Sequence, residues 1–307
     1  MDVFPKDIFT SLPELLKLEG KIKGFSFRPN RQKVRSVLGG KHASKLRGRG
    51  MDFEEVRQYA AGDDIRNIDW KVTARTQKTH SKVFSEEKEK PALIVVDQSQ
   101  SMFFGSQKRM KSVVAAELAA LVAFKIQKEG DRVGGLIFTD NGIDAISPKR
   151  NKKNTFKFLE RIVHHNHQLK KLEKFGNRQD SLNNAISKIK NLVTHDYLVV
   201  IISDFIHYSD QVIQAVSYIS KHNDVVLVKV YDPMEREIPV EKITLGDQKK
   251  QIVADGKSTS ISANFTAGFD NDFQEFESKM KKHKVPVLKM NTIDAIEDQL
   301  RTAFNPA

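Results

Sequence analysis

The sequence predicts an α/β protein built on a mostly parallel sheet with helices on both faces. From Pro91 onward, short apolar runs alternate with longer segments of helical periodicity. The strands read as continuous apolar runs, such as Leu93–Val96, which is typical of strands buried on both faces. With 39% hydrophobic and 29% charged residues, the 307-residue chain has material for one large domain plus an appendage.

The individual elements follow from the apolar runs and the helical spacing. The apolar runs predict strands at Thr79–Glu86, Leu93–Val96, Arg132–Phe138, Ile143–Ile146, Tyr197–Ile202, Val225–Tyr231 and Val285–Lys289, with a small β-excursion over 237–253. The helical periodicity predicts helices at Pro5–Glu19, Lys108–Lys128, Lys153–His164, Ser181–Val193, Ser209–His222, Asp270–His283 and Thr292–Phe304. The run Thr139–Gly142 predicts a hairpin turn.

The first 85 residues differ in composition from the rest. The segment 21–49 carries ten basic residues and no acidic one, within a chain of net charge +12. We therefore expect a basic N-terminal extension with short strands over residues 1–85 and the α/β domain over 86–307. The basic arm 21–49 is open to three interpretations: a solvated arm, a nucleic-acid contact, or a peripheral contact with a membrane surface or an acidic protein. Aromatic residues are sparse there (Phe25 and Phe27), which disfavours nucleic acid.

Composition also excludes several classes of protein. The chain has no cysteine, so disulfides, thiolate metal sites and cysteine nucleophiles are excluded. No stretch approaches the ~20 apolar residues that span a bilayer. The run Met1–Lys6 lacks the basic-then-apolar layout of a signal peptide. The expected location is therefore the cytoplasm.

Polar side chains follow the two most apolar strands. Asp97, Ser99 and Ser101 come directly after Leu93–Val96, and Asp204 follows Tyr197–Ile202. Carboxyl ends of parallel strands share one edge of a sheet, where ligands bind. Two carboxylates and two hydroxyls are hard oxygen ligands that suit Mg²⁺ or Mn²⁺. The alternative is that the serines cap the loop and Asp97 caps the next helix.

Two other interpretations of these side chains are weaker. A phosphatase of the haloacid dehalogenase type would use Asp97 as nucleophile, but it needs a second acid two residues later, where this chain has Ser99. The cluster of His164, His165 and His167 could bind zinc, but no further ligand set lies nearby. We therefore expect a solvated helix end at the histidines, and no enzyme.

The Asp-x-Ser-x-Ser loop resembles the start of a metal-ion-dependent adhesion site in von Willebrand factor A-like domains. The resemblance implies a von Willebrand A-like (Rossmann-like) sheet and binding rather than turnover. Such domains place a threonine just before a Leu and a helix, and in the run Arg178–Leu182 either Asp180 or Ser181 takes that role. A third carboxylate at Asp180 would hold the cation more tightly but weaken its pull on a partner's carboxylate.

A block upstream carries a second resemblance. Gly62-Asp63-Asp64-Ile65-Arg66-Asn67-Ile68-Asp69-Trp70-Lys71, together with the loop Asp97–Met102, is similar to the signature of a prokaryotic domain-of-unknown-function family, number fifty-eight. The match is specific over about residues 48–105. Members are usually encoded beside MoxR-type AAA+ ATPases. The resemblance implies a non-catalytic cytoplasmic partner of such an ATPase and of other A-like proteins, acting in protein complex maturation or stress tolerance.

The residues of this block also suggest a structural role. Arginines and aspartates alternate there, so we expect several half-buried ion pairs, and the only tryptophan is expected to anchor the segment on the A-like domain. The block is either a brace for the sheet or a partner-contact surface. The residues concerned are Arg57, Asp63, Asp64, Arg66, Asp69, Trp70 and Arg75.

Overall fold

The chain divides into two compact units. A larger unit comprises residues 1–27 and 90–307, and a smaller unit comprises 28–89. The computed structural model describes residues 5–21, 51–86, 90–171, 178–206, 208–237, 242–246, 251–255 and 259–304. Nearly all of the predicted basic arm therefore lies outside the described residues.

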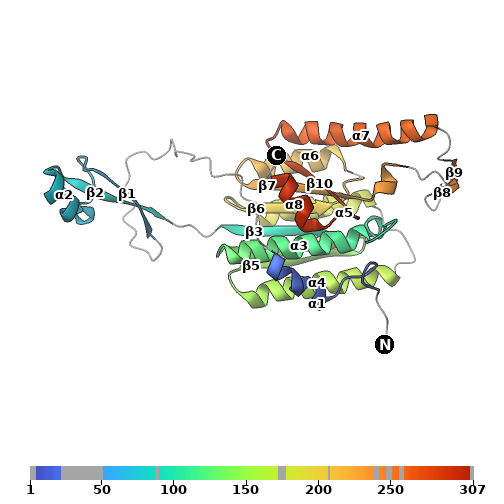
Figure 1. Ribbon diagram of the computed structural model, residues 1–307, viewed down its shortest axis with the longest axis horizontal. Helices are drawn as coiled ribbons and strands as arrows, with labels where there is room; N and C mark the ends of the chain where they lie inside the picture. Colours follow the sequence, from blue (N-terminus) through green and yellow to red (C-terminus); the bar gives the residue numbers. More distant parts are fainter. Residues whose placement is uncertain are drawn as a thin grey trace. The chain divides into compact units, whose positions relative to one another are not determined.

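The larger unit is organised around a sheet with strand order β10-β7-β6-β3-β4-β5 (Figure 1). The strands are β3 (Pro91–Asp97), β4 (Arg132–Thr139), β5 (Gly142–Lys149), β6 (Leu198–Ser203), β7 (Asp224–Tyr231) and β10 (Val287–Asn291). All neighbouring strands pair in parallel except β5, which is antiparallel to β4. The predicted mostly parallel sheet is confirmed. The order of the strands reverses between β3 and β6.

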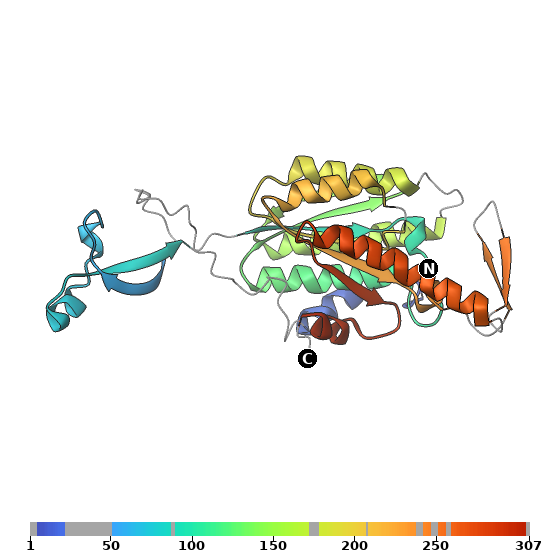
Figure 2. The ribbon, with the colours of Figure 1, turned by 90° about the horizontal axis from the view of Figure 1, so that it is seen from above.

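Helices cover both faces of this sheet (Figure 2). One face carries α1 (Leu12–Lys17), α3 (Lys111–Lys128), α4 (Lys152–Gln168) and α8 (Ile296–Phe304). The other face carries α5 (Arg178–Leu192), α6 (Asp210–Ser220) and α7 (Thr259–Lys281). A hairpin of β8 (Lys242–Gly246) and β9 (Gln251–Asp255) is the predicted β-excursion. Among the described residues, no helix combines the length and apolarity that crossing a bilayer requires.

Side chains of the central strands alternate between two cores. In β3, Ile94 and Val96 pack with α3, whereas Leu93 and Val95 pack with α5. Both sets are buried, which explains why the strand reads as one apolar run rather than an alternating pattern. Packing on both faces thus fixes the strands in position, and with them the starting points of the loops at the carboxyl edge of the sheet.

The N-terminal helix belongs to the larger unit, not to a separate extension. Leu15 of α1 is fully buried, and with Leu18 it joins the core beneath α3 and α4. The predicted extension over 1–85 is therefore not one unit. Its first part, residues 5–21, is held on the sheet domain by the burial of these leucines, and residues 51–86 belong to the smaller unit. The helix is also shorter than the predicted Pro5–Glu19 and continues as a 3₁₀ turn, η1 (Leu18–Lys21).

The smaller unit is a hairpin with two short helical segments. Strand β1 (Met51–Gln58) pairs antiparallel with β2 (His80–Glu86), and between them lie η2 (Ile65–Asn67) and α2 (Trp70–Thr76). Trp70 leaves 69% of its surface exposed. It is therefore not a core residue of its own unit, and its contact with the sheet domain stays a prediction.

Candidate functional site

The structure brings the two predicted acids to one edge of the sheet. Asp97 is the last residue of β3, and Asp204 directly follows β6. The two strands are neighbours, with Val96 in register with Ile202. Because both strands run in the same direction, their carboxyl ends meet, as the sequence predicted.

Hydrogen bonds fix the Asp97 carboxylate and the loop that follows it. Asp97 Oδ1 accepts from the Ser99 backbone N–H at 2.9 Å, and Asp97 Oδ2 accepts from Ser203 Oγ at 2.6 Å. The Ser99 and Ser101 hydroxyl oxygens lie 3.1 Å apart and share a hydrogen bond. Asp97, Ser99 and Asp204 are all buried. The predicted residues therefore form one connected polar cluster.

A small cavity lies within this cluster. Its volume is about 20 Å³, which is room for a single water-sized group. The lining residues are Asp97, Ser99, Ser101, Phe138, Ser181, Leu182, Ser203, Asp204, Phe205 and Ile206. Carboxylate and hydroxyl oxygens around such a space fit one small divalent cation. Within the described part of the chain, no three His, Asp or Glu side chains converge in a metal-binding group.

The third predicted contributor comes from α5. Residues 180 and 181 both lie in the first turn of this helix, not in the preceding loop. Ser181 lines the cavity. The side chain of Asp180 lies outside the described residues, so its role stays a prediction. The choice between Asp180 and Ser181 for the threonine's role therefore stays a prediction as well.

A buried lysine of the site was not predicted. Lys111, the first residue of α3, is buried, and its ammonium group donates to Asp204 Oδ2 at 3.0 Å. The same ammonium donates to Glu235 Oε1 at 2.5 Å. Glu235 belongs to η5 (Pro233–Glu235), which follows β7. In the sequence, Lys111 looked like an ordinary lysine on an amphipathic helix.

Burial and charge set the protonation of the site. Burial and the nearby Asp204 carboxylate raise the pKa of Asp97, against hydrogen bonds from Ser203 and Ser99 that lower it. Burial alone would also raise the pKa of Asp204, but the Lys111 ammonium brings that pKa below its usual value. Burial would lower the pKa of Lys111, yet Asp204 and Glu235 raise it, so the lysine is charged.

Buried amides hold the site loop against the rest of the domain. Gln98 donates through Nε2 to the Ser112 carbonyl and accepts from Asn166 Nδ2. Asn166 Oδ1 in turn accepts from the Thr10 backbone N–H. The Gln100 backbone N–H donates to Asp140 Oδ2 at 2.7 Å. The loop is thereby connected to α4, to the N-terminal segment and to the β4–β5 turn.

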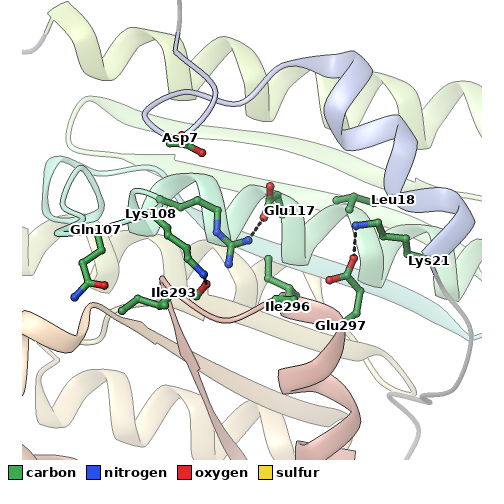
Figure 3. Close-up of a pocket in the computed structure, with 11 residues that line it drawn as sticks. Asp7, Leu18, Lys21, Gln107, Lys108, Glu117, Ile293, Ile296 and Glu297 are labelled. Carbon is green, nitrogen blue, oxygen red and sulfur yellow. Dashed lines mark hydrogen bonds and ion pairs between the residues drawn. The ribbon is translucent and has the colours of Figure 1, made fainter.

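A larger cavity lies elsewhere on the domain, between η1, the start of α3 and the loop before α8 (Figure 3). Its volume is about 420 Å³. Four of its charged side chains form two ion pairs: Arg109 with Glu117 at 2.7 Å, and Lys21 with Glu297 at 2.8 Å. Arg109 and Lys108 also donate to carbonyls before α8. This network braces the C-terminal segment.

The upstream block forms the ion pairs that the sequence suggested, but at the surface. Arg57 contacts Asp63 at 2.7 Å, and Arg66 contacts Asp64 at 2.6 Å. Asp69 caps α2 by accepting from the backbone of Lys71 and Val72. Arg75 is exposed. All of them lie in the smaller unit.

The histidine cluster makes separate contacts. His165 Nε2 lies 3.3 Å from Asp144, and His167 Nε2 lies 2.8 Å from the Thr10 carbonyl. His164 and His165 have their rings in edge contact. His165 and His167 therefore have separate polar partners at the end of α4, and His164 is exposed.

Comparisons with known proteins identify relatives. A family model described as "Protein of unknown function DUF58" matches residues 55–274. The chain is 30% identical over 224 residues to the uncharacterized proteins Rv1480 of Mycobacterium tuberculosis and Mb1516 of Mycobacterium bovis. Each alignment covers 73% of this chain and 68% of the relative.

Solved structures offer more distant likenesses. The conserved hypothetical protein BatB from Bacteroides thetaiotaomicron aligns with 68% of this chain and 92% of its own, at 17% identity and a TM-score of 0.42. An aerotolerance-related membrane protein from Bacteroides fragilis aligns with 70% of this chain and 96% of its own, at 16% identity and a TM-score of 0.44.

Proposed function

The chain belongs to the DUF58 family, and on this premise we propose that it is a non-catalytic protein-interaction module of von Willebrand A-like fold. The observation that carries the proposal is the convergence of Asp97, Ser99, Ser101 and Asp204 on one small cavity. The cavity lies where the strand order reverses, between β3 and β6. Open α/β sheets bind their ligands at this place.

A divalent cation, Mg²⁺ or Mn²⁺, is the proposed cofactor of this site. The hydroxyls of Ser99, Ser101 and Ser181 and the Asp97 carboxylate would hold it, since these oxygens line the cavity. When bound, the ion would supply a positive charge that attracts an acidic group of a partner protein. The protein itself would position the ion and exclude water around it.

The rim of the site indicates the chemistry of a partner. Ile206 lines the cavity and is 46% exposed. Phe104 is 40% exposed, and its ring centroid lies 6.0 Å from Lys111 Nζ. Exposed apolar side chains beside a charged site favour a segment that presents a carboxylate flanked by apolar residues.

The proposed partner is a MoxR-type AAA+ ATPase, together with other A-like proteins, in protein complex maturation or stress response. Support comes from the family to which the chain belongs, whose signature the block Gly62–Lys71 carries. Because the ATPase uses cytoplasmic ATP, the proposal includes a cytoplasmic place of action. The smaller unit offers a second surface for such a partner.

The cation is tested by thermal unfolding with and without millimolar Mg²⁺. Wild type should melt at a higher temperature with Mg²⁺ than with a chelator, because a ligand that binds only the folded state stabilises it. Asp97→Ala should stay folded and lose this difference. Asp298→Ala, on the exposed face of α8, is the matched control and should respond as wild type does. An equal response of wild type and Asp97→Ala would refute the cation site.

Partner binding is tested with a purified MoxR-type ATPase from the same organism. Calorimetry should give binding for wild type and for Asp298→Ala, and weaker binding for Asp97→Ala or with chelator. Binding that Asp97→Ala leaves unchanged would place the interface elsewhere. Turnover of a generic phosphate ester with Mg²⁺, lost in Asp97→Ala, would instead support the phosphatase interpretation.

A further inference from the structure

Lys111 occupies a position that local structure does not favour. It is the first residue of α3, where the helix dipole favours an anion and disfavours a cation by a few tenths of a kcal/mol or more. Its side chain is only 1% exposed, although lysine is almost never buried unless it is paired. A buried cation at this end of a helix therefore needs compensation from its surroundings.

That compensation comes from two carboxylates, each of which follows a different strand. Asp204 follows β6 and Glu235 follows β7, and both accept hydrogen bonds from the Lys111 ammonium. Glu235 also accepts from the Asp232 backbone N–H through its other oxygen, at 2.9 Å. The ammonium therefore connects the start of α3 to the ends of two neighbouring strands.

The same ammonium lies beside the cavity of the candidate site. Asp204 lines that cavity and gives one of its oxygens, Oδ2, to Lys111. Its other oxygen accepts from the Ile206 backbone N–H at 3.2 Å. Asp204 therefore has a cationic partner, which it shares with Glu235, whereas the hydrogen bonds to Asp97 come from neutral groups of Ser99 and Ser203.

We propose that Lys111 is the built-in counter-cation of this site. It holds the carboxyl edge of the sheet together without a divalent ion, and it limits how tightly an added divalent ion binds. A second positive charge near Asp204 is repelled by the ammonium, so the ion depends on Asp97 and the serine hydroxyls. The effect of Lys111 on divalent-ion affinity rests on the proposed function. Its role in holding the carboxyl edge of the sheet together does not.

The first experiment measures melting in chelator, where no divalent ion contributes. Lys111→Met keeps the length of the side chain and removes its charge, so it should melt well below wild type, because Asp204 and Glu235 lose their buried partner. The double variant Lys111→Met/Asp204→Asn should regain much of the loss. Lys128→Met, an exposed lysine of the same helix, is the matched control and should melt as wild type does.

The second experiment measures Mn²⁺ binding from the electron paramagnetic resonance signal of the free ion. Lys111→Met should bind Mn²⁺ roughly tenfold or more tightly than wild type, because the competing charge is gone. Lys128→Met should leave the affinity unchanged. This readout needs no partner and no activity.

The outcomes separate this inference from the proposed function. If Lys111→Met melts as wild type does in chelator, or binds Mn²⁺ no more tightly than a wild type that does bind it, the inference is wrong. If wild type and Lys111→Met both fail to bind Mn²⁺, the proposed cofactor fails, and the chelator series alone decides the role of Lys111. If Lys111→Met does not fold, a double variant Lys111→Met/Asp204→Asn that does fold in chelator supports the counter-cation, and a double variant that also fails to fold contradicts it.

Discussion

Asp232 joins three segments at the carboxyl edge of the sheet. Its carboxylate accepts from the backbone and hydroxyl of Ser106, from the Thr292 hydroxyl and from the Met234 backbone N–H. These donors belong to the loop before α3, the end of β10 and the turn after β7. Burial raises the pKa of Asp232, but these hydrogen bonds outweigh it and lower that pKa below the usual value.

Asp232→Asn should destabilise the fold at neutral pH by roughly 2 kcal/mol, because hydrogen bonds to a buried charge are lost. Because the pKa of Asp232 is lowered in the folded state, its ionised carboxylate stabilises the fold at every pH above the unfolded-state pKa of about 3.9. The difference in the free energy of unfolding between wild type and Asp232→Asn should therefore be largest at neutral pH and should shrink as the pH falls below about 4. Urea unfolding across pH measures it, with Asp298→Asn as the control. A difference independent of pH would contradict this account.

The site residues differ in how far the sequence could reveal them. Asp97 and Asp204 were predictable because each follows a strongly apolar strand, and parallel strands bring their ends together. Lys111 was not, because its position at a helix start gives no sign that its side chain is buried. Glu235 depends on a short turn after β7, so only the tertiary structure shows that it reaches the site.

At the scale of the elements, β4 and α4 approach each other closely at Gly135. Gly135 lies in β4, and a Cβ there would stand 2.1 Å from the ring of Phe158, a fully buried residue of α4. No real contact is that short, so any side chain would push the helix away from the sheet. Glycine is required here for close packing rather than for backbone conformation.

Gly135→Ala should therefore destabilise the domain by about 1–3 kcal/mol, as overpacked cores do. Gly268→Ala is the matched control, since Gly268 is in α7 with open space around it, and alanine there should be neutral or slightly stabilising. Guanidinium unfolding compares the two. A Gly135→Ala variant as stable as wild type would show that α4 can move without loss.

The elements were predicted better than their boundaries. Strands β3, β4, β6 and β7 were expected where they occur, because apolar runs bounded by polar turns define them. Helix α7 begins well before the predicted Asp270, and α8 begins after the predicted Thr292. Thr292 is held by Asp232, a contact distant in sequence, and local periodicity could not show it.

For the whole molecule, the smaller unit is an insertion between α1 and β3. Residues on both sides of it, 1–27 and 90–307, belong to one compact body. The sequence suggested a boundary near residue 85 because composition changes there. Composition could not show that Leu15 returns to the core of the domain that follows.

Replacing residues 28–89 with a Gly/Ser linker should leave the melting temperature close to that of wild type, since the larger unit keeps its own cores. Removing residues 1–27 as well should lower the free energy of unfolding by about 4 kcal/mol or more, because the buried side chains of Phe9, Leu15 and Leu18 are then missing from the core. Calorimetric unfolding measures both. A large loss on replacing 28–89 alone would mean that the sheet domain depends on the insertion.

The contacts of α1 and the residues before it decide how the first segment of the chain is held on the sheet domain. Leu15 is buried, the Thr10 backbone N–H donates to Asn166, and the Met110 backbone N–H donates to the Asp7 carbonyl, so non-covalent contacts retain the first segment. The N-terminal segment thus binds the larger unit through non-covalent contacts, as a separate peptide would. A free peptide of residues 1–27 should bind fragment 90–307 in trans and restore its stability. In the intact chain both ends of the insertion are covalently joined to one compact unit, so after a cut within the insertion these contacts would still hold the two pieces of that unit together.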